Sequence, residues 1–417
     1  MTVTVPEASA FILADICPLP IERVPLLDAL GRVLATPVVA PLTLPPWDNS
    51  AMDGYAVRSA DVEAATPEHP VVLRVLELVP AGARPTLAIG PGEATQVMTG
   101  APVPSGADCV VRIEDTDGGD ARVAVRNGRD ARRNVRPRGE DIHAGQVVIP
   151  AHTPIGAAQI GVLASVGAAA VEVYRRPRVA IAGSGNEIVD LDRFHEVLAG
   201  TKIVSSNSYA LHALVRSAGG VPVNLGVAAD SPAAIRALLE RATGCDVIIT
   251  TGGVSVGAFD YTRDVLAELG AEMRFWKVRM RPGAPVGYGL LRGTPWIGLP
   301  GNPVSTMVTF ELFVRPAIRL MLGHEHLFRR PIPVVLEEPV TIHADLTHFL
   351  RAIIRTREDG VVTARLTGPQ GSGILTSMSL ANALLVVPGE RPRVEAGETL
   401  HALVLTDDAA LSPTFAL

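Results

Sequence analysis

The residues that could do chemistry gather in short loops that follow apolar, strand-like runs. The most informative loop is "IITTGGVSVGAFDYT", in which Gly252, Gly253 and Gly257 would let backbone N–H groups approach an oxyanion closely. It is not a Walker loop, because no Lys-Ser/Thr pair follows the glycines, and it is not a GxGxxG fingerprint. The pattern predicts an anion-binding loop; the alternative is a tight strand-to-helix turn with Asp260 as an N-cap.

Two other loops have the same position after a strand-like run. In "AGSGNEIVD" the carboxylate of Glu187 could face a ligand crevice, or could be an exposed charge at a turn. In "GLPGNPVSTM", Pro300, Gly301 and Pro303 predict a rigid loop that opens a helix with proline at its first position. Such a loop could hold backbone amides toward a phosphate, and it is equally explicable as a plain helix start.

A group of cations lies between these loops in the sequence "FWKVRMRPGAP". Lys277, Arg279 and Arg281 alternate along a probable strand, so they should share one face. Three cations on one face could neutralise a phosphate or another oxyanion. They could also be the charged edge that keeps a strand soluble.

Several carboxylates lie in or beside these loops and could act together on a metal ion. They are Asp53, Asp141, Glu187, Asp230 and Asp260. Hard oxygen ligands of this kind suit Mg²⁺, which shares its shell with water and substrate phosphates, although each carboxylate alone could be a cap or a surface charge. His324 and His326 in "GHEH" lack a third nearby ligand, so we read them as solvated or capping residues. No pattern indicates a Ser-His-Asp nucleophile.

The elements that must position these loops change in character along the chain. Strands and helices alternate in the middle, which predicts a three-layer α/β domain with a mostly parallel sheet and ligands at the carboxyl ends of its strands. Short β runs separated by turns come before and after it, and helical periodicity marks "ASAFILADI" and "PLLDALGRVLA" near the N-terminus. We therefore expect a linking helical domain (6–42 and 143–176), an inserted β-rich domain (43–142), the α/β domain (177–327) and a barrel-like C-terminal β domain (328–417).

Composition narrows the class of protein. The chain has 417 residues, 47% of them hydrophobic and 19% charged, which is typical of several packed globular domains. A formal net charge of −6 argues against a protein whose main task is binding nucleic acid. Three scattered cysteines, no basic leader before an apolar block, and no uninterrupted apolar span predict a cytoplasmic protein without a membrane segment.

With these segments in view, the chain resembles the molybdopterin molybdenumtransferase family, which includes MoeA and the gephyrin E-domain. The resemblance is carried by phrases in the family's order and spacing: "DNSAMDGYAVR", "MTGAPVPSGADCVVRIEDT", "RPRGEDI", "TTGGVSVGAFDYT", "FWKVRMRPG", "LPGNPVS" and "QGSGILTSMSLANAL". It implies that adenylylated molybdopterin and molybdate combine with the help of Mg²⁺, that AMP leaves, and that the dithiolene keeps the metal. It also implies a homodimer with an inter-subunit cleft, and contacts with the adenylyltransferase and with apo-molybdoenzymes.

The resemblance assigns roles residue by residue. It implies catalytic roles for Asp53, Glu187, Asp260 and Lys277. It implies metal binding by Asp53, Glu187, Asp230 and Asp260. It implies substrate binding by Thr99, Arg136, Asp141, Gly252, Gly253, Ser255, Gly257, Arg281, Pro300, Gly301, Asn302, Pro303, Arg351 and Ser372.

The chain departs from the family at a few positions that bear on function. Asn186 stands where the family usually has Asp, Ser205 where it has Asp, and Arg281 and Ala284 where it has Lys. An Arg can still bind phosphate, but with a planar fork in place of a point charge. These departures keep two alternatives open: a non-catalytic carrier or scaffold of the finished cofactor, and the preceding adenylyltransferase, which uses a related α/β domain.

Overall fold

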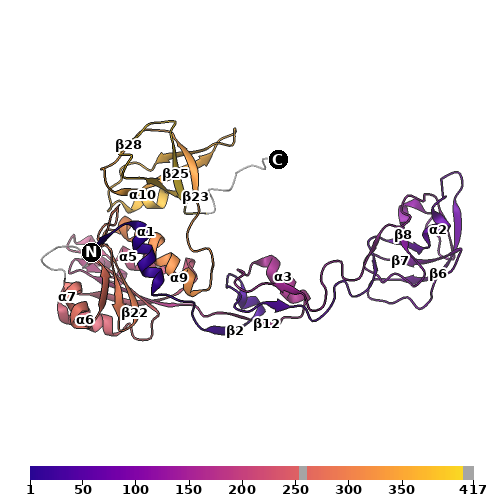
Figure 1. The fold of residues 1–417 in the computed structure, drawn as a ribbon, viewed down its shortest axis with the longest axis horizontal. Coiled ribbons are helices and arrows are strands. Elements are labelled where there is room, and N and C mark those ends of the chain that lie inside the picture. The colour runs from indigo at the N-terminus through magenta and orange to yellow at the C-terminus, as the bar shows by residue number, and fades with distance from the viewer. Residues whose placement is uncertain (253–260, 407–417) are drawn as a thin grey trace. The chain divides into compact units, whose positions relative to one another are not determined.

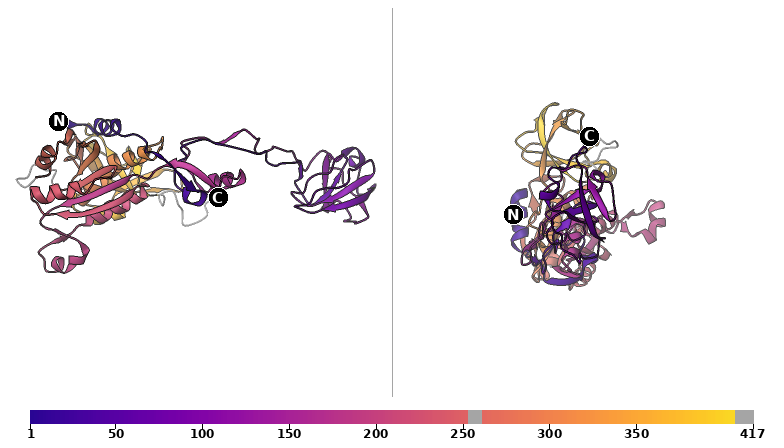
Figure 2. Two further views of the ribbon diagram at one scale, coloured as in Figure 1. Left: turned by 90° about the horizontal axis from the view of Figure 1, so that it is seen from below. Right: turned by 90° about the vertical axis from the view of Figure 1, so that its right-hand side faces the viewer.

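The structure is a computed structural model that describes residues 1–252 and 261–406. The chain divides into two compact units, which are described separately (Figures 1 and 2). The larger unit contains residues 1–35, 152–156 and the chain from 170 onward, and the inserted unit contains residues 36–151 and 157–169. An α/β part and a C-terminal barrel together make up most of the larger unit.

The α/β part is built on a six-stranded sheet in the order β16-β13-β17-β22-β21-β18. Its strands are β13 (Arg178–Ser184), β16 (Val221–Ala228), β17 (Val247–Thr251), β18 (Glu272–Phe275), β21 (Gly287–Leu291) and β22 (Thr294–Leu299). The first four strands in the spatial order are parallel, and β21 is antiparallel to both of its neighbours. The mostly parallel sheet expected from the alternating pattern is therefore confirmed.

Helices cover both faces of this sheet, because its central strands are apolar on both sides. Ile181 and Ile249 pack in one core and Ala180 and Ile248 in the other. The first face is covered by α1 (Val5–Ala14), α5 (Ser206–Ser217), α8 (Pro303–Thr309) and α9 (Arg315–Met321), and the second by α6 (Pro232–Glu240) and α7 (Tyr261–Glu268). Figure 1 labels all of these helices except α8. A π-helical turn, Phe310–Val314, joins α8 to α9. The three-layer arrangement is confirmed.

The N-terminal segment differs from the helical reading of the sequence. Helix α1 forms as expected, with Thr4 and Glu7 making a capping box, but it packs into the core of the α/β part. The prediction of a second helix over "PLLDALGRVLA" is wrong, because only a 3₁₀ turn forms there, at Leu26–Ala29. The reason is tertiary pairing, because the N–H groups of Gly31 and Leu34 donate to carbonyls of residues 155 and 153. Strand β2 (Ile21–Pro25) pairs with β12 (Ala170–Tyr174) beside this turn.

The C-terminal part closes into a five-stranded barrel. Its strands are β23 (Pro331–Leu336), β25 (Thr347–Thr356), β26 (Val362–Leu366), β27 (Ala383–Val387) and β29 (Thr399–Val404), and pairing of β25 with β27 closes the ring. Alternate side chains such as Val334, Leu350 and Leu385 fill its interior. Strand β20 (Met280–Arg281) leaves the α/β part and adds to the edge of β25, so the cationic segment reaches the barrel.

Smaller elements complete the larger unit. They are β1 (Thr2–Val3) paired with β19 (Lys277–Val278), β14 (Ile188–Val189) paired with β15 (Ile203–Val204), β24 (Val340–Thr341) paired with β28 (Arg393–Val394), α4 (Phe194–Leu198) and α10 (Leu375–Leu380). No helix among the described residues is long and apolar enough to span a bilayer. Residues 155–174 contain a short helix, α3 (Ala157–Ser165), followed by β12.

The inserted unit contains a five-stranded sheet in the order β8-β5-β7-β6-β9. Its strands are β5 (Gly54–Val57), β6 (Val71–Val79), β7 (Glu93–Val97), β8 (Cys109–Arg112) and β9 (Arg122–Val125), accompanied by α2 (Ser59–Val62) and α3 (Ala157–Ser165). Two short ladders pair β3 (Val38–Val39) with β11 (Val147–Ile149) and β4 (Asn49–Ser50) with β10 (Val135–Arg136). This unit carries "DNSAMDGYAVR", with Asp53 immediately before β5.

Candidate active site

The four parallel strands of the α/β part end together at one edge of the sheet. Ser184 of β13 pairs with Ala228 of β16, and Thr251 of β17 pairs with Leu299 of β22. The segments that follow these strands contain Asn186 and Glu187, Asp230, Gly252, and Pro300 to Asn302. Because parallel strands place their carboxyl ends along the same edge, the structure brings these predicted loops together.

Asn186 and Asp230 tie two of these loops to each other. The Asn186 backbone N–H donates to Asp230 Oδ2 at 3.0 Å, and the Asp230 backbone N–H donates to Asn186 Oδ1 at 3.1 Å. Lys202 adds a bond from Nζ to the Asn186 carbonyl at 2.6 Å. The amide oxygen of Asn186 therefore accepts a hydrogen bond from the Asp230 backbone, and a neutral side chain is sufficient for this contact. Glu187, the next residue, is exposed.

Close backbone approach explains Gly252 at this edge, and backbone conformation explains Gly185. A Cβ on Gly252 would lie 2.9 Å from the Ser184 carbonyl oxygen, and Gly252 has a φ of +80°. Gly185 has a φ of +151°, a backbone conformation that favours glycine, and a Cβ there would meet only side-chain atoms, such as the Glu187 carboxylate at 2.9 Å. The loops thus pack tightly at the sheet edge. Gly253, Ser255, Gly257 and Asp260 lie outside the described residues, and their roles stay predictions.

The rigid loop expected at "LPGNP" is held by side chains from two helices. Asn207 of α5 donates from Nδ2 to the Gly301 carbonyl at 2.7 Å, and Thr306 of α8 donates from Oγ1 to the Pro300 carbonyl at 2.6 Å. Pro303 begins α8, as the sequence predicted. Side chains of neighbouring helices therefore fix the loop geometry. Within the loop, Gly301 and Asn302 are exposed to solvent.

A pocket of about 990 Å³ lies next to this loop, inside the larger unit. It is bounded by β20, the Pro300 loop, strand β25 and the segment around Ser372. Five of the predicted substrate-binding residues line it: Arg281, Pro300, Asn302, Arg351 and Ser372. Asn302 Nδ2 donates to Ser372 Oγ at 2.9 Å, which joins the two loops across the pocket wall. Residues 70 positions apart in the sequence thus form one polar surface.

Lys277 and Arg281 occupy two successive short strands. On β19, Lys277 pairs with Thr2 of β1. On β20, Arg281 pairs with His348 of β25. Lys277, Arg279 and Arg281 are exposed, while Val278 and Met280 between them are buried, so the alternation read from the sequence is found. Arg279 donates to the Asp345 carbonyl at 3.1 Å. Of these three cations, Arg281 is the one that lines the pocket.

Arg351 is fully buried, and its guanidinium holds the 369–371 segment. Its Nη1 donates to the Gln370 carbonyl at 3.1 Å, and its Nη2 donates to the carbonyls of Pro369 at 3.2 Å and Gly371 at 3.0 Å. Nε donates to Ser377 Oγ at 2.9 Å. Burial lowers the pKa of Arg351 from its usual value. These bonds shape the loop that presents Ser372, and direct substrate contact by Arg351 stays a prediction.

In the inserted unit, the structure joins Asp53 to Thr99. Asp53 Oδ1 accepts from the Thr99 backbone N–H at 2.6 Å and from its hydroxyl at 2.7 Å. The backbone bond, followed by the hydroxyl bond, lowers the pKa of the Asp53 carboxyl. Both residues are exposed, and Oδ2 takes no part in these bonds. Asp53 is therefore an oriented, ionised carboxylate with one oxygen left for a ligand.

The remaining predicted residues of this unit lie on segments that pair with the Asp53 loop. Arg136 pairs with Asn49 across β4 and β10, and it is exposed. Asp48 Oδ1 accepts from the Arg138 backbone N–H at 2.6 Å, so Asp48 ties the segment after β10 to the start of β4. Asp141, also exposed, donates its backbone N–H to the Leu44 carbonyl at 3.1 Å. The structure thus places both predicted residues on backbone bonded to the segment that leads into Asp53.

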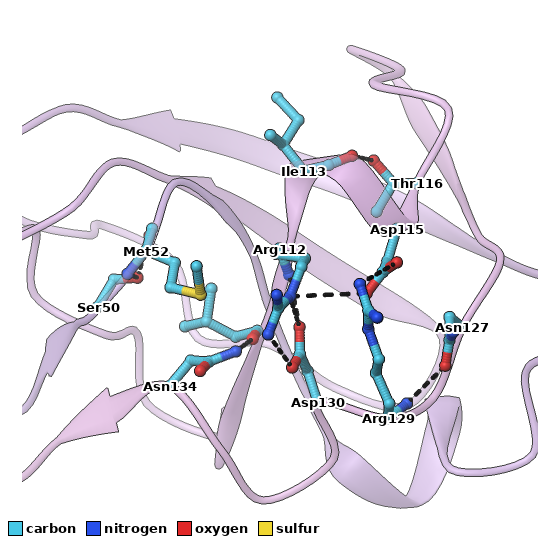
Figure 3. Close-up of polar contacts among 11 residues, drawn as sticks. Ser50, Met52, Arg112, Ile113, Asp115, Thr116, Asn127, Arg129, Asp130 and Asn134 are labelled. Carbon is cyan, nitrogen blue, oxygen red and sulfur yellow. Dashed lines mark hydrogen bonds and ion pairs between the residues drawn. The ribbon is translucent and has the colours of Figure 1, made fainter.

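An ion pair joins Arg112, whose side chain is partly exposed, to Asp130, whose side chain is buried (Figure 3). Arg112 donates from Nε to Asp130 Oδ2 at 2.8 Å and from Nη2 to Asp130 Oδ1 at 2.9 Å. Burial opposes ionisation of Asp130, but the hydrogen bonds from Arg112 outweigh it, so its pKa is lowered. Arg112 pairs with Gly54, and the next residue, Ile113, donates its backbone N–H to the Asp53 carbonyl at 3.1 Å. The ion pair therefore fixes the strand against which Asp53 is placed.

Sequence reasoning missed two side chains of the larger-unit pocket. Gln370 clamps Arg351 from both sides, accepting from its N–H at 2.9 Å and donating to its carbonyl at 3.1 Å. His348 is buried and lines the pocket. Gln370 begins "QGSGILTSM", which could have drawn attention to it, whereas a single histidine in a barrel strand gives no spacing signal.

Taken together, the fold and the polar loops define a class: a multi-domain α/β protein with an inserted β unit, a C-terminal barrel, and polar loops suited to anionic ligands. Family models match along nearly the whole chain: the MoeA N-terminal region (domains I and II) at residues 3–167, a probable molybdopterin-binding domain at 180–320, and the MoeA C-terminal region (domain IV) at 333–405. The chain belongs to the MoeA family.

Individual relatives agree with this assignment. Molybdopterin molybdenumtransferase 2 of Mycobacterium tuberculosis is 41% identical over 92% of this chain and 95% of its own. Molybdopterin molybdenumtransferase of Nostoc sp. is 38% identical over 92% of this chain and 88% of its own. The crystal structure of the molybdopterin biosynthesis moeA protein from Pyrococcus horikoshii OT3 matches with a TM-score of 0.83 and 30% identity, covering 97% of this chain and 100% of that one.

Proposed function

We propose that this protein transfers molybdenum from molybdate to adenylylated molybdopterin and releases AMP. The observation that carries the proposal is the pocket of about 990 Å³, in which Arg281, Asn302 and Ser372 meet beside the strand-end loops of the α/β part. A cation and hydrogen-bond donors around a cavity suit an oxyanion. Membership of the MoeA family selects molybdate among the oxyanions that such a pocket could bind.

The hydrogen bonding of the pocket supports oxyanion binding. Because Asn302 donates to Ser372 Oγ, the hydroxyl hydrogen of Ser372 is left to donate elsewhere. Arg281 supplies a permanent positive charge and up to five N–H donors. We assign oxyanion binding to Arg281 and Ser372, with Arg351 and Asn302 positioning Ser372. The loops at Gly252 and Pro300 to Pro303 would hold the phosphates of the nucleotide adduct.

The carboxylates fit a magnesium ion by the chemistry of their donors. Asp53 keeps Oδ2 outside its bonds with Thr99, and Glu187 is exposed, so hard oxygen donors are available. Among residues 1–252 and 261–406, however, no three His, Cys, Asp or Glu side chains form a metal-binding group. We propose that Asp53, Glu187, Asp230 and Asp260 would hold Mg²⁺. When bound, Mg²⁺ would neutralise charge on the pyrophosphate oxygens.

We further propose that the protein is a homodimer whose site is shared between subunits. The residues proposed to be catalytic or metal-binding are divided between the two compact units: Asp53 lies in the inserted unit, whereas Glu187, Asp230 and Lys277 lie in the larger unit. A shared site would use the inserted unit of one copy and the larger unit of the other. We also propose that the reaction takes place in the cytoplasm, where exposed thiols such as Cys17 stay reduced.

The test is AMP release from adenylylated molybdopterin with Mg²⁺, with and without molybdate. The proposal predicts molybdate-dependent release, together with a product that activates an apo-molybdoenzyme. Consumption of ATP to adenylylate molybdopterin would identify the protein as the adenylyltransferase instead. Tight binding of the adduct without AMP release in either condition would identify it as a carrier, and the departures at Asn186 and Ala284 would then be the first positions to revert.

A further inference from the structure

His348 occupies a distinctive place in the wall of the larger-unit pocket. It lies on β25 directly opposite Arg281 of β20, and both side chains line the cavity. Only 4% of His348 is exposed, so the imidazole is part of the wall and not of the rim. Strand β25 also carries Arg351, three residues further along, so His348 shares its strand with the side chain that holds the Ser372 loop.

The Nε2 atom of His348 is buried without a hydrogen-bond partner among the described residues. A buried polar atom without a partner is destabilising, so such an atom calls for an explanation. A backbone hydrogen bond with His343 favours the protonated ring, which identifies the backbone group as the carbonyl acceptor. In the neutral ring we therefore assign the proton to Nδ1, which leaves a lone pair on the unpartnered Nε2.

The charged groups around His348 oppose its protonation in the empty pocket. Burial is the largest influence, followed by the positive charge of Arg281 on β20 and by His343 in the segment before β25, and together they lower the pKa of His348. Arg351 on β25 is also cationic. Among the residues that the structure describes, no carboxylate acts on the ring to offset these effects. At neutral pH the free pocket therefore contains a neutral His348.

We propose that His348 is a proton-linked oxyanion-binding residue: when an oxyanion enters the pocket beside Arg281, His348 takes up one proton at Nε2 and donates it as a hydrogen bond to the ligand. This inference rests on the proposed function, because it concerns the same pocket. A dianion would supply the negative charge that the empty pocket lacks, and it would give Nε2 its missing partner. In the neutral ring, the lone pair on Nε2 would instead face the anion unfavourably.

Thermodynamic linkage turns this proposal into a measurable pH dependence. Since the anion stabilises the protonated ring, it must raise the pKa of His348, and the oxyanion must bind more tightly as the pH falls. Between the pKa of the free and of the bound state, affinity should change by about tenfold per pH unit, with the uptake of about one proton. At higher pH, above the bound-state pKa, the affinity should stop changing.

The experiment is calorimetric titration of the full-length protein with molybdate at pH 6.5, in MES and in imidazole buffer. Phosphate is avoided, because it would compete for the pocket. The two buffers release protons with different enthalpies, so the difference between the two binding enthalpies gives the number of protons taken up. We expect uptake approaching one proton for the native protein. Molybdate binding without proton uptake would overturn the inference while leaving the proposed function intact, whereas an absence of molybdate binding would count against both.

Two variants locate the proton. His348→Gln keeps a polar side chain of similar size but cannot titrate, so proton uptake should fall to near zero and molybdate affinity at pH 6.5 should drop about tenfold. His401→Gln, at an exposed position on β29 and outside the pocket lining, is the matched control and should retain uptake. Uptake that persists in His348→Gln would show that the ligand or another group carries the proton. If His348→Gln does not fold, His348→Asn takes its place with the same expected loss of uptake, and a native protein that binds molybdate without proton uptake overturns the proposal in either case.

Discussion

Asp53 and Thr99 are 46 residues apart, and two hydrogen bonds, of 2.6 and 2.7 Å, join them at one carboxylate oxygen. This relationship orients Asp53 without occupying Oδ2, and it keeps the carboxyl ionised by lowering its pKa. A residue held in this way is prepared to act on a ligand or a metal ion. It gives a structural reason for placing Asp53 at the centre of the proposed chemistry.

Replacing Asp53 by Asn should reduce the rate of AMP release by at least about 100-fold, because it removes the charge while conserving shape. Thr99→Val should have a smaller effect, since the backbone N–H of residue 99 can still donate to Asp53. Single-turnover assays of AMP release by both variants, with circular dichroism as the folding control, would show which substitution lowers the rate more. A native rate in Asp53→Asn would remove this residue from the catalytic assignment.

A shared site makes a prediction for mixed dimers. Asp53→Asn and Glu187→Gln subunits should each be inactive alone. A heterodimer isolated with two affinity tags should recover roughly half of the native activity, because one of its two sites receives both intact residues. A site built within one subunit would give an inactive heterodimer. Light scattering on the native protein, which should show a dimer, is the companion measurement.

The Arg112–Asp130 pair should contribute measurably to the stability of the inserted unit. Only 1% of the Asp130 side chain is exposed, so Asp130→Asn should destabilise the strands around β8 by roughly 2–3 kcal/mol. Hydrogen exchange at the amides of β5 and β8 would report the loss locally. Glu395→Gln, which removes an exposed ion pair with Arg393, is the matched control and should change little.

The same pair predicts a direction for acid sensitivity. The folded-state pKa of Asp130 is lowered, so its stabilising contribution is complete above its unfolded-state pKa, near 4, and is lost as the pH falls through the folded value. Protection of the β8 amides in the native protein should therefore decline below about pH 4, while Asp130→Asn should show a smaller decline. Parallel declines in the two proteins would assign the acid sensitivity to other groups.

Arg351→Lys should weaken oxyanion binding by at least about tenfold although the charge is retained. A lysine cannot reproduce the planar fork that serves the carbonyls of Pro369, Gln370 and Gly371, so the loop carrying Ser372 should loosen. Arg355→Lys, at an exposed position on the same strand, is the control. Equal molybdate affinities in the two variants would separate Arg351 from the binding site.

Much of the larger unit could be predicted from the sequence, because its signals are local. Apolar strands such as 247–251 and capped helices such as α6, with Ser231 at its N-cap, follow directly from residue patterns. The helix expected over "PLLDALGRVLA" did not form, since Gly31 and Leu34 bond to a segment more than 100 residues away. Helix propensity is a local property, so it gives no information on hydrogen-bond partners that are distant in the sequence.

The candidate site was predictable to the extent that its residues lie in recognisable phrases. Arg281, Asn302 and Ser372 each belong to one, and the structure unites them in one pocket. The indirect role shown for Arg351, and the presence of His348 and Gln370, depend on burial and on hydrogen bonds across the barrel wall. Neither can be read from spacing along the chain.

The most direct test of the proposed function is the ratio of AMP released to molybdenum retained in a single turnover. Purified protein, loaded with adenylylated molybdopterin and Mg²⁺, would be mixed with molybdate, and nucleotide and protein-bound metal would be measured together. A transferase predicts one AMP for each molybdenum atom retained and no AMP when molybdate is omitted. Equal AMP release with and without molybdate, or molybdenum bound with the nucleotide intact, would contradict the proposed function.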